Sequence, residues 1–124
     1  MKENNIIPDK SYQFALMVVK LFRYLCFEKK EYHLYKQLVH SGTSFGSTIE
    51  EAIGGSSRND FKAKLDIAYK EARETRFWLM LLRYSHILEL KAANSMIQDC
   101  EELIRILVPI LKTLKKYSFP AVNY

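Results

Sequence analysis

Apolar residues recur at alternating intervals of three and four in four segments of the chain, and this periodicity restricts the fold more than any other feature. Such intervals place one apolar stripe along an α-helix and are typical of the seams between packed helices. The third segment is the clearest example, with its seam at Phe61, Leu65, Ala68, Ala72, Thr75, Leu79 and Leu82. The periodicity predicts helices at approximately residues 10–27, 31–54, 58–85 and 92–116.

The connections between these segments are short, and helices joined by short loops pack most simply as antiparallel neighbours. Only four glycines and three prolines occur in 124 residues, few for an all-β chain with its many turns. The sequence therefore predicts an all-α protein, an antiparallel up-down-up-down four-helix bundle that forms a single domain over residues 1–124. We expect residues 118–124 to fray.

The centre of the second segment, residues 41–48, is rich in serine, threonine and glycine and has a low intrinsic helix propensity. Gly42 and Phe45 nevertheless keep the phase of the seam. Because tertiary packing commonly overrides propensity, we expect the helix to continue through this stretch. Its small residues would let a neighbouring helix approach closely.

The first and fourth segments carry more apolar residues than a single stripe needs. Ala15 and Val19 widen the first, and Leu103, Ile106 and Ile110 add a flank to the fourth. Large contiguous apolar patches are rare on monomeric proteins. We therefore expect a homo-oligomer in which these two helices supply much of the interface.

No arrangement of chemically reactive residues resembles a catalytic or metal site. His33, His40 and His86 lie in different segments, and no Glu-x-x-His motif of a di-iron bundle occurs. The glycines form neither a phosphate-binding loop nor a dinucleotide fingerprint. We expect a protein that is not an enzyme and that carries no metal and no cofactor.

The two most apolar runs, near residues 15–27 and 103–114, are interrupted by charged residues. Neither approaches the roughly 20 apolar residues that a membrane span needs. Residues 1–10 are polar and do not resemble a signal peptide. We expect a cytoplasmic protein with no membrane partner.

Polar residues line two flanks that lie beside the seams of the second and third segments. Small hydroxyl groups that face carboxylates across such a boundary can form a partly buried hydrogen-bond network that fixes the helix register. The alternative is a groove that binds a ligand or a partner. The residues in question are Ser41, Ser44, Thr48, Glu51, Glu71 and Glu74.

Basic residues gather on the third segment, and the formal net charge of the chain is +5. A mildly basic chain permits an anionic partner without requiring one. Repeated around an oligomer, however, a basic arc would become a ring of positive potential. The candidate nucleic-acid-binding residues are Lys62, Arg73, Arg76 and Arg83, with Arg58 and Lys70 as outliers.

Tyrosine is abundant, and exposed tyrosine rings can stack on nucleic-acid bases. The tyrosines considered for this role are Tyr32, Tyr35, Tyr69, Tyr84 and Tyr117.

Two stretches of the chain resemble the four-helix bundle proteins encoded in 23S rRNA intervening sequences. Residues 38–44 (LVHSGTS) and 48–52 (TIEEA) look like the second-helix signature of that family. Phe61, the run KEARET at residues 70–75 and the pair Trp78-Leu79 look like its third-helix signature.

The resemblance covers about residues 11–116. It implies a bacterial cytoplasmic protein with an up-down four-helix fold, usually assembled as a homopentamer. A related branch, the accessory variability proteins of diversity-generating retroelements, forms a basic pentameric barrel that binds nucleic acid and a reverse transcriptase. The family offers no catalytic residue to carry over.

Our leading interpretation is a non-enzymatic homo-oligomeric bundle that binds nucleic acid, RNA in particular, through its backbone and with little sequence readout. The alternative is a protein-protein interaction scaffold with no nucleic-acid role, whose grooves hold a partner protein. Reversing the charges of Arg73 and Arg76 would abolish binding under the first interpretation. Changes on the exposed flanks of the first and fourth helices would matter more under the second.

Overall fold

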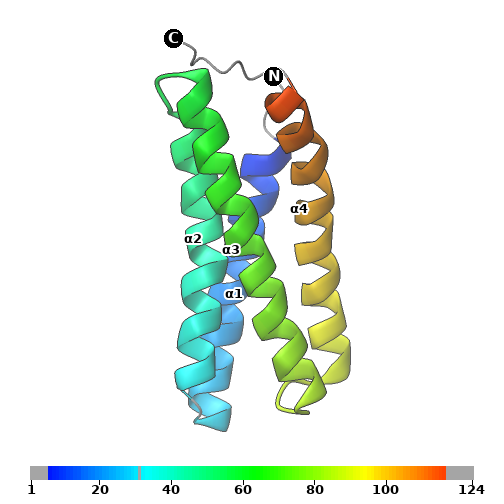
Figure 1. Cartoon of the computed structure of the whole chain (residues 1–124). Coiled ribbons are helices and arrows are strands. Elements are labelled where there is room, and N and C mark those ends of the chain that lie inside the picture. Colours follow the sequence, from blue (N-terminus) through cyan, green and yellow to red (C-terminus); the bar gives the residue numbers. More distant parts are fainter. Residues whose placement is uncertain (1–5, 31, 117–124) are drawn as a thin grey trace.

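A computed structural model describes residues 6–30 and 32–116, and within them the chain forms four α-helices and no strand. The helices are α1 (Ile6–Tyr24), α2 (His33–Ile53), α3 (Arg58–Tyr84) and α4 (Leu90–Lys116), and a π-helical turn, η2 (Leu25–Lys29), follows α1. Successive helices run in opposite directions along the bundle (Figure 1). The predicted all-α four-helix bundle is confirmed, whereas the expected fraying of residues 118–124 lies outside the described residues.

All four helices contribute to one core. Val18 of α1, Tyr35 of α2, Leu79 of α3 and Leu107 of α4 have no exposed surface. Complete burial of an aliphatic side chain contributes about 1.5–3 kcal/mol relative to its exposure. The predicted seam of the third segment is this core: six of its members are buried, at Leu65, Ala68, Ala72, Thr75, Leu79 and Leu82.

Glycines on α2 bring α1 and α2 close together. A Cβ atom at Gly42 would lie 2.9 Å from Cγ2 of the buried Val18. A Cβ atom at Gly46 would lie 3.4 Å from the carbonyl oxygen of Ser11 on α1. As expected, α2 continues through residues 41–48 despite their weak propensity, because the small residues allow a close helix packing that repays it.

The ends of α1 differ from the prediction. Among the described residues the helix spans Ile6–Tyr24, and Pro8 falls in its first turn, where a missing N–H costs nothing. It ends at Tyr24, where the backbone widens into η2. Lys30 then adopts a left-handed conformation with φ of 56°, and its N–H donates to the Leu25 carbonyl at 3.1 Å.

The ends of α3 are defined by hydrogen bonds that fix the position of its surface residues. Ser57 is the N-cap, and its hydroxyl accepts a hydrogen bond from the Asp60 N–H at 3.0 Å. At the other end, the His86 N–H donates to the Arg83 carbonyl and the Ile87 N–H to the Leu82 carbonyl, each at 3.1 Å. This pair of bonds is a Schellman motif, which closes the last turn of the helix.

Candidate nucleic-acid interface

Two of the basic residues predicted on α3 are held in ion pairs. Lys62 Nζ lies 3.0 Å from Asp66 Oδ2, one turn along the same helix. Arg76 Nε lies 2.8 Å from Glu101 Oε2 of α4. Their carboxylate partners neutralise much of the charge that a phosphate would meet, so Lys62 and Arg76 contribute less positive potential than the sequence alone suggests.

Three other predicted residues, Arg58, Lys70 and Arg73, are exposed. Within the described residues no ion pair joins any of them. Arg73 and Lys70 lie one turn apart, whereas Arg58 begins the helix, about 22 Å from Arg73 at 1.5 Å per residue. The structure thus brings Lys70 and Arg73 together and leaves Arg58 apart.

A fourth exposed cation, Arg105, was missed from the sequence. The Arg76–Glu101 ion pair sets the register of the antiparallel helices α3 and α4. Arg73 precedes Arg76 by about one turn and Arg105 follows Glu101 by about one turn, so the two arginines lie at nearly the same level. We call the exposed set of Lys70, Arg73 and Arg105 the α3–α4 basic face.

Arg83 and Tyr84 form a contact at the end of α3. The Arg83 guanidinium carbon lies 4.6 Å from the centre of the Tyr84 ring, and its Nη1 donates to the tyrosine hydroxyl at 3.0 Å. The Arg83 Nε is buried and has no hydrogen-bond partner among the described residues. Arg83 therefore orients the Tyr84 ring, which is 62% exposed.

The other tyrosines differ in accessibility. Tyr35 is fully buried, so the suggestion that it stacks on bases is wrong. Tyr32 is exposed, Tyr69 is half-buried, and Tyr117 lies outside the described residues. Phe77 was not among the residues predicted from the sequence, and it is 57% exposed.

Phe77 contacts Trp78 edge to face, with ring centres 5.0 Å apart and planes at 75°. The Trp78 Nε1 in turn donates to Glu74 Oε2 at 3.1 Å. The periodicity could have indicated an exposed aromatic at Phe77, because this residue falls opposite the seam of its helix.

The polar residues predicted between α2 and α3 form contacts with different partners rather than one network. Ser41 Oγ lies 3.0 Å from the hydroxyl of Thr75, a buried seam residue. The Thr75 hydroxyl is also 2.8 Å from the Glu71 carbonyl oxygen, and the Ser41 hydroxyl donates to the Leu38 carbonyl at 3.3 Å. This buried contact links the two helices at one level and fixes their register.

Glu71 occupies the same boundary and has a perturbed carboxyl group. Its burial raises its pKa, and a hydrogen bond from the Thr48 hydroxyl opposes that effect. Its Oε1 is buried without a hydrogen-bond partner among the described residues. Glu51 instead pairs with Lys64 at 3.0 Å.

The remaining members, Ser44 and Glu74, lie outside the Thr48–Glu71 contact. Ser44 is half-buried, and its carbonyl accepts a hydrogen bond from the Ser47 hydroxyl at 3.1 Å. Glu74 binds the indole of Trp78. These contacts favour a packing role for the boundary between α2 and α3 over the role of a binding groove.

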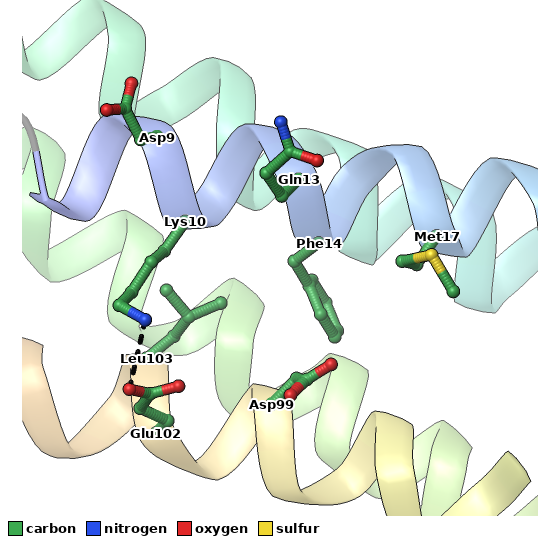
Figure 2. Close-up of a pocket in the computed structure, with 8 residues that line it drawn as sticks. All are labelled: Asp9, Lys10, Gln13, Phe14, Met17, Asp99, Glu102 and Leu103. Atoms are coloured by element: carbon green, nitrogen blue, oxygen red, sulfur yellow. Dashed lines mark ion pairs between the residues drawn. The ribbon is translucent and has the colours of Figure 1, made fainter.

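A cavity of about 300 Å³ lies between α1 and α4 (Figure 2). Its charged lining is mainly acidic, with Asp9, Asp99 and Glu102, and Lys10 Nζ lies 3.2 Å from Glu102 Oε2. Burial and the nearby Glu102 raise the pKa of Asp99. An acidic cavity of this kind repels phosphate, so it does not extend the α3–α4 basic face.

The apolar surplus is exposed mainly on α1. Tyr12, Leu16 and Val19 are exposed on the side of α1 that faces away from the core, and we call them the α1 apolar face. The flank of α4 is less accessible, because Leu103 is buried and Ile106 is half-buried. Beside the α1 apolar face, a groove of about 830 Å³ runs between α1 and α2.

Within the described residues, no group of three or more His, Cys, Asp or Glu side chains could hold a metal ion. In the same part of the chain, no helix is both long enough and apolar enough to cross a membrane.

Two comparisons relate the chain to known proteins. The model of the family described as 23S rRNA-intervening sequence protein matches residues 3–109. A crystal structure of a protein of unknown function from the S23 ribosomal protein family of Bacteroides thetaiotaomicron is 41% identical, with a TM-score of 0.84. The similarity covers 86% of this chain and 99% of that chain. No curated protein matches.

The family model covers most of the chain. The solved structure has the same fold as this chain, and the match covers nearly the whole length of that protein. Neither comparison indicates a catalytic family. The chain belongs to the family of 23S rRNA-intervening sequence proteins.

Proposed function

We propose that this protein is a non-enzymatic, homo-oligomeric bundle that binds nucleic acid, RNA in particular, through the α3–α4 basic face. The observation that carries the proposal is the exposure of Lys70, Arg73 and Arg105 on neighbouring helices. No ion pair joins these three side chains within residues 6–30 and 32–116. Cations of this kind bind phosphates and release condensed counterions, which favours association.

The expected contributions of the basic residues to nucleic-acid binding differ from those that the sequence suggests. Arg73 and Arg105 are expected to contribute most, since both are exposed and lie at the same level. Lys62 and Arg76 are expected to contribute less, because Asp66 and Glu101 already hold them. Arg58 would serve only a ligand long enough to span α3.

Oligomerisation would repeat this face around an axis and so strengthen a weak local attraction. The exposed α1 apolar face supports self-association, because a row of large apolar side chains is costly to leave in water. We propose a homopentamer, the assembly implied by the family resemblance, in the bacterial cytoplasm. Light scattering of the purified protein should then give about five times the 14.6 kDa of one chain.

The proposal is tested by fluorescence-anisotropy titration against a structured RNA and a duplex DNA at low and near-physiological salt. Binding through several phosphates should weaken steeply with salt, with log K falling by about 0.9 per neutralised phosphate per decade of salt on duplex DNA. Arg73→Glu combined with Arg105→Glu should abolish binding. The matched control is Lys36→Glu combined with Lys91→Glu, which changes the net charge equally at exposed sites on α2 and α4.

A protein-interaction scaffold is the second candidate function. The groove between α1 and α2 favours it, since Tyr12, Ala15 and Gly46 line a concave surface beside the α1 apolar face. Under this alternative, charge reversal on α3 and α4 leaves the interaction unchanged, and Tyr12→Glu abolishes it. Capture from a lysate by the wild-type protein, compared with these two variants, separates the two functions.

A further inference from the structure

We propose that the nucleic acid bound by this protein is single-stranded, with its bases stacked on Phe77 and Tyr84 of α3. This inference rests on the function proposed above and specifies its ligand. It depends on the exposed aromatic rings that lie in line with the basic residues of the same helix.

Lys70, Phe77 and Tyr84 follow one another at intervals of seven residues. Seven residues are nearly two helical turns, so the three side chains share one face of α3 and stand about 10.5 Å apart along it. Arg73 lies one turn before Phe77 on the adjoining edge of this face. We call these four residues the aromatic–basic row.

Both rings are accessible and held by neighbours. Tyr84 is 62% exposed, and Arg83 orients it by a cation–π contact and a hydrogen bond. Phe77 is 57% exposed, and the edge-to-face contact with Trp78 restrains it. An aromatic ring that is already oriented loses less conformational freedom when a base stacks on it.

The row suits a single strand better than a duplex. The bases of a duplex are stacked within the helix, so surface rings cannot reach their faces, whereas an unpaired base can stack on any exposed ring. Lys70 and Arg73 would meet the phosphates of the same strand. A duplex could use the charges of the row alone, and its binding would gain nothing from Phe77 or Tyr84.

The charges beside the rings also favour nucleic acid over a second copy of this chain. Of the carboxylates near the row, Glu74 binds the Trp78 indole and Asp66 binds Lys62. Lys70 and Arg73 keep no such partner within the described helices. Two copies that met through this row would bring these cations toward each other, which is unfavourable.

The test compares a labelled oligo(U) strand with an RNA duplex of equal length, each titrated with the full-length protein at low salt. Phe77→Leu and Tyr84→Leu remove a ring but keep an apolar side chain. Each should weaken oligo(U) binding about five-fold to a hundred-fold and leave duplex binding within about two-fold. Tyr84→Phe, which retains the ring, should keep most of the affinity. Leu81→Ala, an exposed apolar residue on the same side of α3, is the control and should bind normally.

Trp78, the single tryptophan of the chain, supplies a second measurement. Because its ring lies 5.0 Å from Phe77, a base on Phe77 should quench its fluorescence, and the duplex should not. Oligo(U) affinities unchanged in both leucine variants would overturn the inference, as would equal losses for strand and duplex. Loss of the oligomer in these variants, seen by light scattering, would assign the row to contacts between copies and overturn it too.

Failure of the proposed function itself has a different signature. In that case neither strand nor duplex binds at low salt, and Arg73→Glu with Arg105→Glu changes nothing. Binding that is lost in the charge-reversed variant but indifferent to the two rings would retain the basic face and reject base stacking.

Discussion

His86 is a non-glycine residue in the left-handed region of backbone space, with φ of 63°, where it closes the Schellman motif of α3. Its Cβ atom makes this conformation unfavourable by roughly 1–2 kcal/mol, whereas glycine adopts it freely. The histidine is exposed, so no buried contact compensates for the cost. His86 is therefore a position where the local backbone, rather than packing, limits stability.

We predict that His86→Gly raises the free energy of unfolding by about 0.5–1 kcal/mol, the strain relieved less the greater flexibility of glycine in the unfolded chain. Urea denaturation followed by circular dichroism measures the change. His86→Ala keeps the Cβ atom and is the matched control, which should bring no gain. Equal stabilities for the glycine and alanine variants would contradict the assigned strain.

The pKa of Glu71 is raised by burial, so the folded protein binds a proton at this carboxyl more readily than the unfolded chain. Stability should then fall as pH rises from the ordinary glutamate range through the raised pKa. We predict that Glu71→Gln removes this part of the pH dependence and stabilises the protein at neutral pH. Glu50→Gln, an exposed glutamate on α2, is the control, and denaturation between pH 4 and pH 8 is the measurement. Parallel pH profiles for wild type and Glu71→Gln would refute the prediction.

At the scale of the elements, the close packing of α1 on α2 depends on one glycine more than on the other. The space at Gly42 is already occupied by the fully buried Val18, whereas at Gly46 an added methyl group would make a tight but nearly ordinary contact. Alanine improves intrinsic helix propensity equally at both sites, by about 1 kcal/mol. The two positions therefore separate packing from propensity.

We predict that Gly42→Ala destabilises the protein by about 1–3 kcal/mol, since overpacking outweighs the gain in propensity. Gly46→Ala should be neutral or slightly stabilising. Chemical denaturation of the two variants side by side decides the point. Equal effects at the two positions would show that α1 and α2 shift easily to accommodate an added methyl group.

The helices could be predicted best from the sequence, because the apolar residues that face the core of each helix recur at a regular spacing. The third segment illustrates this, from Leu65 to Leu82. The end of α1 was not predicted, since η2 changes the hydrogen-bond pattern without any change in apolar spacing. The candidate site could be predicted only in part. Periodicity places Arg73 and Arg76 on one helix surface, but the Arg76–Glu101 ion pair depends on the register between α3 and α4.

For the whole molecule, the proposed assembly rests on the outward side of α1. Tyr12, Leu16 and Val19 present apolar surface where a solitary bundle would carry polar residues. The proposed homo-oligomer buries this face, and the nucleic-acid interface on α3 and α4 is then repeated around it. The basic face and the aromatic–basic row share Lys70 and Arg73, whereas the proposed assembly is assigned to a different surface of the bundle.

We predict that Leu16→Glu dissociates the oligomer, because it places a charge in an apolar contact between copies. Light scattering should then give the 14.6 kDa of one chain, with the helical circular dichroism retained. Lys36→Glu, an exposed change on α2, is the control and should leave the assembly intact. An unaltered mass for Leu16→Glu would exclude this part of α1 from the interface.

Binding of nucleic acid by the proposed α3–α4 basic face is best tested by the salt-dependent anisotropy titration of the wild type and the Arg73→Glu, Arg105→Glu variant. We predict wild-type binding that weakens steeply with salt, loss of that binding in the variant, and normal binding by the Lys36→Glu, Lys91→Glu control. Absence of wild-type binding at low salt would contradict the claim, and so would equal affinities for the wild type and the Arg73→Glu, Arg105→Glu variant.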